Sequence, residues 1–295
     1  MSLIAVALAA AAALGLYAGW VEPRALRIRH ARSEIPGLAA PLRAVVIGDL
    51  QPYRHHWSGP RLRAAFARAA AERPDIVLWL GDYFNAPTRG LKRALEATRL
   101  DGLYARACTP MAEIAAAMGT LTAPMGAFAV LGNHDWAWDG EACAAALREA
   151  GVTVLIGETA EAVHPKTGAR LTVIGLDDAS SLRPPGWDRL APAWREPAIL
   201  LTHAPDIWGA IDRPPALTLA GHSHGGQVLM PLIGASRLPY LGASHVRGWY
   251  RRGEARLLVT AGLGSSGPPV RLGVPPEIVV LDLAPGQESG ASRRA

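Results

Sequence analysis

Three short islands of metal-binding residue types, each placed after a run of apolar residues, constrain this chain more than any other feature. They are Gly81-Asp82, Gly132-Asn133-His134-Asp135 and Gly221-His222-Ser223-His224. Glycine lets the backbone turn sharply and come close to an ion. Asp, Asn and His supply oxygen and nitrogen donors suited to a borderline divalent metal. With Gly48-Asp49-Leu50-Gln51 and Leu201-Thr202-His203, the islands form an ordered series that predicts a metal site.

The apolar runs before the islands predict buried strands. Strands alternate with helices early in the chain and dominate after Val152, so we expect an α/β fold of two packed sheets flanked by helices. The expected strands cover residues 43–48, 75–80, 127–131, 152–156, 170–175, 198–202, 216–220, 227–230, 246–251, 256–260 and 277–283, and the expected helices cover 61–71, 91–98, 111–118 and 140–150. Active groups in such folds gather at the C-terminal ends of strands, which is where the candidate ligands fall.

The N-terminus carries an uncharged apolar run from Leu3 to Val21. A helix of that length spans about 28 Å, close to the hydrocarbon thickness of a bilayer. No basic segment precedes the run and no small-x-small cleavage motif follows it, so we expect a retained transmembrane anchor over residues 1–22, with a signal-like segment as the alternative. Arginines at positions 24, 27, 29 and 32 would place the rest of the chain in the cytoplasm. Alternatively, these arginines belong to the first strand and carry no information on topology.

The net charge is +5, and the basic residues are almost all arginine. No arginine run is dense enough to resemble a nucleic-acid-binding arm, so we favour a compositional bias of the genome and expect no nucleic-acid partner. A basic rim that attracts a phosphate-bearing substrate or an anionic membrane surface is the alternative. The two cysteines, Cys108 and Cys143, are expected to be small buried side chains.

In their order along the chain, these motifs resemble the calcineurin-like metallophosphoesterase superfamily, whose pattern is D-x-H, GD, GNHD or GNHE, a lone His and GH-x-H. The match runs from about Arg43 to Leu283. The segments 220–227, 260–264, 271–273 and 276–277 are similar to a subgroup of membrane-associated bacterial phosphoesterases, some of which cleave UDP-2,3-diacylglucosamine in lipid A synthesis. The resemblance implies a two-sheet β-sandwich flanked by helices, behind an N-terminal transmembrane helix in the bacterial inner membrane.

The expected domain organisation follows from this match. After the anchor, residues 23–42 form a connector and an early strand, and residues 43–284 form the metallophosphoesterase domain. Residues 285–295 are small and polar, and we expect a disordered tail there.

The resemblance further implies two divalent metal ions, with Mn²⁺ favoured and Fe, Zn²⁺ or Mg²⁺ as alternatives. Asp82 would bridge the metals, and the remaining ligands would divide between them: Asp49, Gln51 and His224 on the first, and Asn133, His203 and His222 on the second. His134 would face the substrate as a catalytic group that stabilises the transition state and can protonate the leaving oxygen. Asp135 would orient His134.

Gln51 departs from the family pattern, which has histidine at that position. A glutamine carbonyl is a neutral, hard oxygen donor, so we expect weaker binding at the first metal or a shift toward Mn²⁺ or Mg²⁺. His55 and His56 could replace the missing ligand or contact substrate, although solvated loop positions are the more common case.

Other side chains are weaker candidates for contact with substrate. Arg54 and Arg271 could grip a phosphate, because a guanidinium binds it through two hydrogen bonds. The aromatic residues Trp136, Trp138, Trp249 and Tyr250 could line an apolar wall near the site or could equally be ordinary core.

The expected function is a membrane-tethered hydrolase that cleaves a phosphodiester or pyrophosphate bond by attack of a hydroxide that the metals activate. UDP-2,3-diacylglucosamine is the leading substrate hypothesis, because a lipid-bearing nucleotide suits an anchored enzyme. One alternative is a generic phosphodiesterase or phosphomonoesterase acting on nucleotides or phospholipids. Another is a catalytically weak binding protein that retains the fold, which only Gln51 favours.

Overall fold

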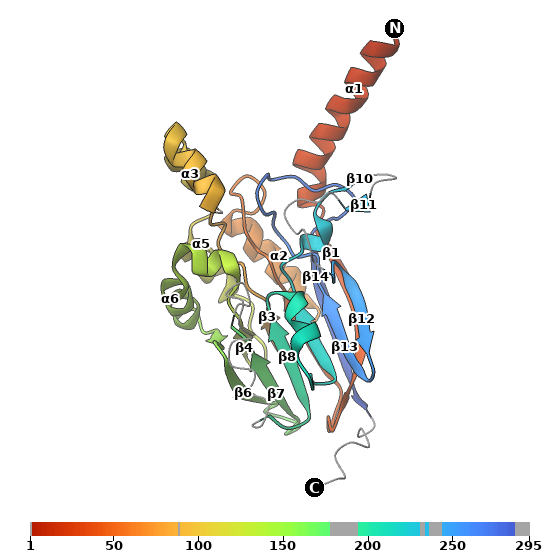
Figure 1. Ribbon diagram of the computed structural model, residues 1–295. Coiled ribbons are helices and arrows are strands. Elements are labelled where there is room, and N and C mark those ends of the chain that lie inside the picture. The colour runs from red at the N-terminus through yellow and green to blue at the C-terminus, as the bar shows by residue number, and fades with distance from the viewer. Residues whose placement is uncertain (1, 88, 178–193, 231–233, 236–243, 287–295) are drawn as a thin grey trace.

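The protein is described by a computed structural model that covers residues 2–87, 89–177, 194–230, 234–235 and 244–286 (Figure 1). The helices and helical turns are α1 (Leu3–Leu16), η1 (Tyr17–Val21), η2 (Glu22–Arg24), α2 (Gly59–Ala71), α3 (Arg89–Thr98), α4 (Asp101–Ala107), α5 (Met111–Met118), α6 (Asn133–Glu149), η4 (Pro205–Ala210) and η5 (His224–Gly226). The strands are β1 (Arg27–Pro36), β2 (Leu42–Ile47), β3 (Ile76–Trp79), β4 (Ala127–Ala129), β5 (Thr153–Val154), β6 (Glu158–Val163), β7 (Arg170–Gly175), β8 (Ala198–Thr202), β9 (Leu217–Ala220), β10 (Leu229–Met230), β11 (Gly234–Ala235), β12 (Gly248–Arg252), β13 (Ala255–Val259) and β14 (Glu277–Gly286).

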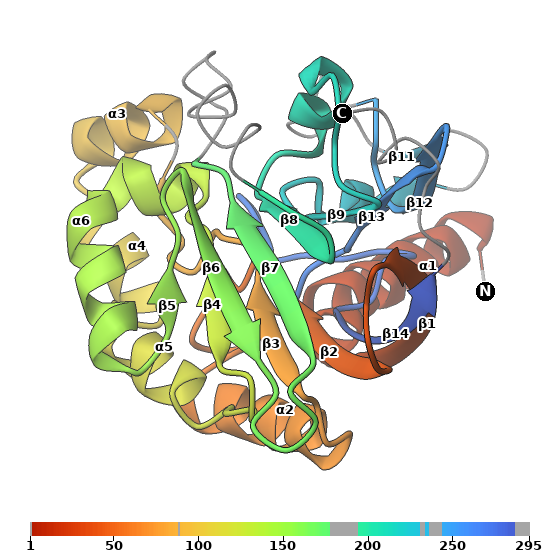
Figure 2. The same ribbon diagram turned by 90° about the horizontal axis from the view of Figure 1, so that it is seen from below.

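Two six-stranded sheets pack face to face, as the view from below shows (Figure 2). The first has the strand order β1-β14-β2-β3-β4-β5 and the second β12-β13-β9-β8-β7-β6. Strands β2 to β5 run parallel in the first sheet, and β13, β9, β8 and β7 run parallel in the second. Parallel strands bring their carboxyl ends, and the loops that follow them, to the same edge of a sheet. That edge is where the expected ligands lie.

The alternation of side chains along β2 explains the two-layer core. Val45 and Ile47 belong to the cluster that packs against helices α2, α5 and α6. Ala44 and Val46 belong to the cluster between the two sheets. Because both faces of the strand are buried, its sequence is an apolar run without polar alternation. This confirms the predicted fold class of two sheets flanked by helices.

Several elements differ from the sequence-based expectation or extend it, and helix α4 is one that was not expected. The early strand β1 pairs in parallel with β14 and so belongs to the first sheet. Strand β6 was not expected, because its Glu- and Ala-rich sequence lacks an apolar run. Helix α6 begins at Asn133 rather than near 140, with a kink at Asp139, because Asp135 in its first turn accepts the Gly132 N–H. Strand β14 continues through Gly286, into the segment expected to be a tail, and residues 287–295 lie outside the described part.

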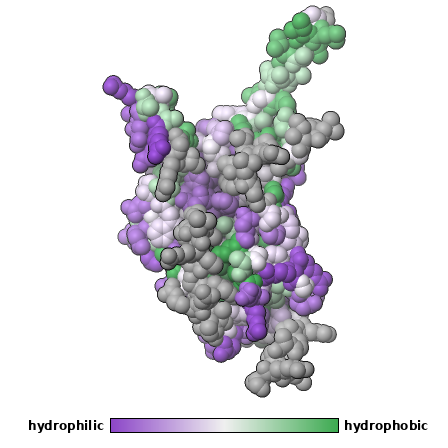
Figure 3. All heavy atoms as spheres, viewed as in Figure 1, coloured by the Kyte–Doolittle hydropathy of each residue, from purple (hydrophilic) through white to green (hydrophobic). Residues whose placement is uncertain are grey.

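Helix α1 projects from one end of the body, and Figure 3 shows it as an apolar extension. The helical run Leu3–Arg24 is long and apolar enough to cross a membrane, and none of its best window is buried in the protein. A signal sequence has the same length and composition. The structure therefore agrees with the predicted span without choosing between a retained anchor and a signal sequence.

Candidate metal centre

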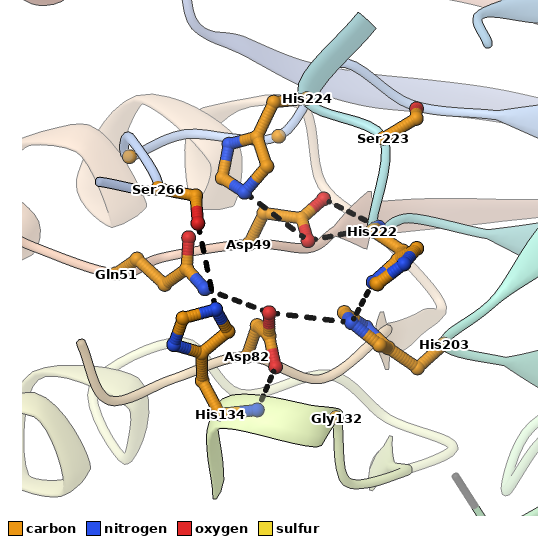
Figure 4. A network of polar contacts seen from close by, with 12 residues as sticks. Asp49, Gln51, Asp82, Gly132, His134, His203, His222, Ser223, His224 and Ser266 are labelled. Carbon is orange, nitrogen blue, oxygen red and sulfur yellow. Dashed lines mark hydrogen bonds and ion pairs between the residues drawn. The ribbon is translucent and has the colours of Figure 1, made fainter. Parts of the chain in front are cut away.

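Every expected ligand follows the C-terminal end of a parallel strand. Asp49 and Gln51 follow β2, Asp82 follows β3, Asn133 follows β4, His203 follows β8, and His222 and His224 follow β9. These side chains follow strands of both sheets, and Figure 4 shows those of Asp49, Gln51, Asp82, His203, His222 and His224 gathered around one centre. The site therefore depends on the packing of the two sheets against each other.

The backbone at these positions is strained. Five of the expected ligands have positive φ: Asp49 (52°), Gln51 (21°), Asp82 (56°), His222 (70°) and His224 (48°). Non-glycine residues rarely adopt this left-handed conformation, and clusters of such residues mark functional sites.

The island glycines leave room for carboxylates. A Cβ at Gly132 would lie 2.2 Å from Asp82 Oδ1, and one at Gly221 would lie 2.7 Å from Asp49 Oδ2. Atoms cannot approach that closely, so any larger residue would displace the two carboxylates. The glycines of the islands are thus required by the close approach of the backbone to the ligands.

Two clusters of potential ligand atoms share one residue. Asp82, His203 and His222 form one cluster, and Asp49, Asp82 and His224 form the other, each with its ligand atoms within 4.8 Å of one another. The shared member is Asp82, which lies in the middle of Figure 4. This is the division expected for a bridging carboxylate between two metals.

In the cluster around His203, the imidazole is oriented by the backbone. Its Nδ1–H donates to the carbonyl of Leu80 at 2.8 Å, which turns Nε2 into the site. Nε2 lies 3.1 Å from Asn133 Oδ1, 3.3 Å from Asp82 Oδ2 and 3.0 Å from His222 Nδ1. A cation suits this concentration of lone pairs, and Asn133 stands with the histidines as expected.

Beside the cluster around Asp49, the side-chain amide of Gln51 has a hydrogen-bond partner for its nitrogen but none for its oxygen. Its Nε2 donates to Asp82 Oδ2 at 2.7 Å, whereas its buried Oε1 has no hydrogen-bond partner. A buried unsatisfied carbonyl oxygen is costly unless something fills its lone pairs. A hard divalent cation would do so, and the residues present therefore fit the two-metal centre, Gln51 included.

The electrostatics of the site favour a bound cation. Burial raises the pKa of Asp49 to about 7. Burial also opposes the ionisation of Asp82, but His203 and His134 outweigh it and lower the pKa of that carboxyl. Burial, reinforced by His203, lowers the pKa of His222 to about 3, so this imidazole is neutral and can act as a ligand near pH 7.

His134 presents one ring nitrogen to the site. Its Nδ1–H donates to the carbonyl of Ala86 at 2.5 Å, and its backbone N–H donates to Asp82 Oδ1 at 2.9 Å. Nε2 lies 3.4 Å from the hydroxyl of Ser266. Ser266 was missed in the sequence, where it is one of several small residues after Gly264. Its backbone is held by Gln227, whose Oε1 accepts the Ser266 N–H at 2.8 Å.

Asp135 does not contact His134 in the way that was expected. Its Oδ2 accepts the N–H groups of Asp82 and Gly132 at 2.8 and 2.9 Å. Its Oδ1 accepts those of Tyr83 and Phe84 at 2.8 and 3.1 Å. All four donors are backbone groups, so Asp135 fixes the loop that carries Asp82, and His134 is oriented instead by the Ala86 carbonyl.

Several weaker candidates lie elsewhere. His56 Nε2 bonds to Gly19 O at 2.9 Å, and His55 stacks on Trp20, so neither histidine belongs to a ligand cluster. Arg271 is fully buried and donates to three backbone carbonyls, those of Gly264, Val274 and Ala261, which excludes the expected role as an open substrate clamp.

Two further candidates, Arg54 and Trp138, lie at the surface, and the two cysteines lie in the interior. Arg54 pairs with Glu113 at 3.1 Å on the surface. Trp138 is 41% exposed and packs on Phe84. Cys108 and Cys143 are both buried, and neither forms a disulfide bond in the described part of the chain.

Comparison with known proteins agrees with the geometry. A model of the family described as calcineurin-like phosphoesterase matches residues 42–246. The phosphodiesterase YaeI of Escherichia coli (strain K12) is 29% identical over 269 residues, which cover 90% of this chain and 89% of that protein. The uncharacterized metallophosphoesterase YkuE of Bacillus subtilis (strain 168) is 29% identical over 213 residues, 72% of this chain and 68% of that protein.

Among solved structures, a 5'-nucleotidase precursor from Thermus thermophilus matches with a TM-score of 0.45 and 16% identity, over 83% of this chain and 54% of that one. This chain thus spans about half the length of that structure. The match over most of the described domain, together with the ordered islands, shows that this chain is a phosphoester hydrolase and belongs to the calcineurin-like phosphoesterase family.

Proposed function

We propose that this chain is a membrane-tethered, two-metal phosphodiesterase that cleaves a phosphodiester or pyrophosphate bond in a lipid-bearing substrate. The observation that carries the proposal is the sharing of Asp82 by two clusters of ligand atoms. A pair of metals held in this way can act on both the attacking and the leaving oxygen of a phosphoryl centre. The name of the relative YaeI, a phosphodiesterase, supports the choice of a diester.

The metal ligands divide as the clusters do. Asp49, Gln51, Asp82 and His224 would hold one ion, and Asp82, Asn133, His203 and His222 would hold the other. When bound, the metals supply a water of lowered pKa and offset the negative charge of the phosphate. Mn²⁺ is the proposed ion, because it accepts the neutral amide oxygens of Gln51 and Asn133 beside imidazole.

His134 is the proposed catalytic residue. Because Nδ1 keeps its proton on the Ala86 carbonyl, the exchangeable proton is at Nε2, on the side that faces the site. Nε2 can hold that proton against the substrate and transfer it to the leaving oxygen. The Ser266 hydroxyl, at 3.4 Å, is placed to keep the ring in this orientation.

The junction between the apolar helix and the catalytic body supports a lipid substrate. His56 bonds to Gly19 O at 2.9 Å, Arg271 N donates to Ala18 O at 2.9 Å, and Gly273 N donates to Glu22 Oε2 at 2.9 Å. The loop containing His56 also carries Gln51, and the Arg271 guanidinium lies 3.5 Å from His224 Nδ1. The end of the anchor and the metal centre are therefore joined by two short loops.

If α1 is an anchor, this arrangement supports a site close to the membrane surface. UDP-2,3-diacylglucosamine is the proposed specific substrate on the strength of the resemblance, with the catalytic domain on the cytoplasmic side. A phosphodiester of a phospholipid or a nucleotide is the second candidate, which the phosphodiesterase name of YaeI favours.

The test uses the full chain in vesicles, loaded with Mn²⁺. Metal content is measured by elemental analysis, and turnover is measured on bis(p-nitrophenyl) phosphate, a phospholipid diester and UDP-2,3-diacylglucosamine. We expect two metals per chain and turnover that a chelator abolishes. Turnover of simple diesters without the UDP lipid would reject the lipid A assignment, and a chain with metal but no turnover of any diester would reject the phosphodiesterase proposal.

A further inference from the structure

A pocket lined by arginines lies outside the metal centre, at the end of the apolar N-terminal helical run. It has a volume of about 200 Å³. Its charged lining residues are all arginines, and the rest of the lining is apolar: Arg24, Arg61 and Arg68, with Leu26, Trp57, Ala64 and Ala65. A pocket that gathers three positive charges and has no carboxylate in its lining is suited to an anion.

The sequence of α2 explains why two of the arginines face the pocket. Arg61 and Arg68 are seven residues apart, which is about two helical turns, so they lie on the same face. The buried side chains Leu62 and Phe66 point to the core and leave the arginine face outward. Helix packing therefore fixes the direction in which these two charges project.

Neutral backbone carbonyls hold two of the guanidinium groups in place. Arg24 donates to Trp20 O and to His55 O, both at 2.6 Å. Arg61 donates to His56 O at 3.1 Å. Arg24 also lies over the Trp20 ring, 3.2 Å from its centroid. These contacts order the side chains without supplying a negative charge. Some of the donor groups are used in this way, and each guanidinium has five N–H donors in all.

The pocket arginines also lack acidic partners within the described residues. No salt bridge there involves Arg24, Arg61 or Arg68. Arg54, on the neighbouring loop, does pair with Glu113. The three guanidinium charges of the pocket therefore have no carboxylate partner among the described residues.

We propose that this arginine pocket binds the phosphate of an anionic phospholipid headgroup. Arginine recognises phosphate through paired hydrogen bonds, and it keeps its charge in partly buried positions. The volume is below the range typical of drug-sized ligands, so it suits one phosphate better than a nucleotide. Arg24 ends the candidate span, which sets the pocket at the level of lipid headgroups. The lipid source rests on the proposed anchoring of α1.

The test compares two arginines of the same helix in the full chain. Both side chains are exposed, but Arg61 lines the pocket, whereas Arg63 lies about 200° away around the helix axis and does not line it. Native mass spectrometry of the detergent-solubilised chain, titrated with phosphatidylglycerol or phosphatidylcholine, reports the affinity for each lipid. We expect tighter binding of phosphatidylglycerol, about fivefold weaker in Arg61→Gln and unchanged in Arg63→Gln.

Arg68→Gln is the second variant. Within the described part of the chain the Arg68 side chain makes no hydrogen bond to the loop backbone, so this variant keeps the loop contacts and should still weaken lipid binding as Arg61→Gln does. Equal losses in Arg61→Gln and Arg63→Gln would mean a diffuse charge effect and overturn the pocket. A parallel titration with inorganic phosphate distinguishes the source. If Arg61→Gln weakens phosphate binding while the wild type shows no preference for phosphatidylglycerol, the occupant is soluble phosphate and the lipid assignment fails.

Two readouts on the same samples separate this proposal from the function proposed above. Turnover of bis(p-nitrophenyl) phosphate tests the hydrolase alone, and we expect Arg61→Gln to retain it. Partition of the wild-type chain into phosphatidylcholine vesicles tests the anchor alone. Normal turnover and partition with no preference for phosphatidylglycerol or phosphate would reject the pocket and leave the phosphodiesterase proposal standing.

Discussion

Replacing Asp135 by Asn separates the role that the structure gives this carboxylate from the role expected from the sequence. Asn keeps one acceptor oxygen and puts an NH₂ group in place of the other. Two of the four backbone N–H groups, either the pair on Oδ1 or the pair on Oδ2, would then face a donor. Asp135 is fully buried, so water cannot replace the lost acceptor.

The magnitude follows from those two bonds. A buried N–H that loses its acceptor costs about 1–3 kcal/mol, so two such losses in Asp135→Asn should lower the free energy of unfolding by about 2–6 kcal/mol. For a domain of this size, that corresponds to a fall in Tm of at least about 4 °C. Because two of the donors are Asp82 N–H and Gly132 N–H, the bridging carboxylate should also move and metal content should fall.

The assay is thermal unfolding by calorimetry with elemental analysis on the same sample. Asp139→Asn is the matched control, since Asp139 lies on the same helix, is exposed and, among the described residues, accepts only the Ala142 N–H at 3.0 Å. We expect that control to change stability by no more than about 0.5 kcal/mol. If Asp135→Asn lowers turnover while Tm and metal content match the control, then Asp135 acts on His134 and does not serve as the anchor of the Asp82 loop.

Three further predictions concern the metal centre. His134→Ala should reduce turnover of bis(p-nitrophenyl) phosphate by about 10²- to 10⁴-fold with metal content unchanged, and a loss of metal would instead make His134 structural. Gln51→His should tighten the first metal and favour Zn²⁺ over Mn²⁺ in competitive loading, and unchanged loading would show that Gln51 is not a ligand. Gly262→Ala should reduce Tm and metal content, because its Cβ would lie 2.5 Å from Asp49 Cβ. Gly253→Ala has a similar positive φ and no neighbour within 4 Å, so it reports the backbone strain alone, and equal effects of the two would refute the contact.

The strand pattern and the identity of the ligand types could be predicted because both depend on neighbours in sequence. The apolar run before Asp82 and the glycine beside it identify a strand end from local information alone. The order of the islands then gives the family. Strand β6 could not be found in this way, since a partly exposed strand at the edge of a sheet needs no apolar run.

The partners of the side chains could not be predicted, because they are distant in sequence. Arg271 resembles an open phosphate clamp in the sequence, and only the fold shows it buried on backbone carbonyls. Ser266 lies 132 residues from His134 and reaches it through the packing of a loop that no local pattern marks.

The sequence by itself determined where the strands end and which donor atoms follow them, because chain turns and side-chain alternation are set by adjacent residues. The tertiary structure decided which donors meet. Asp82 became the shared member of two clusters, Asp135 became the anchor of its loop, and three arginines came to line one pocket beside α1. Those outcomes depend on how two sheets and a helix pack, since packing alone sets distances between residues that are far apart along the chain.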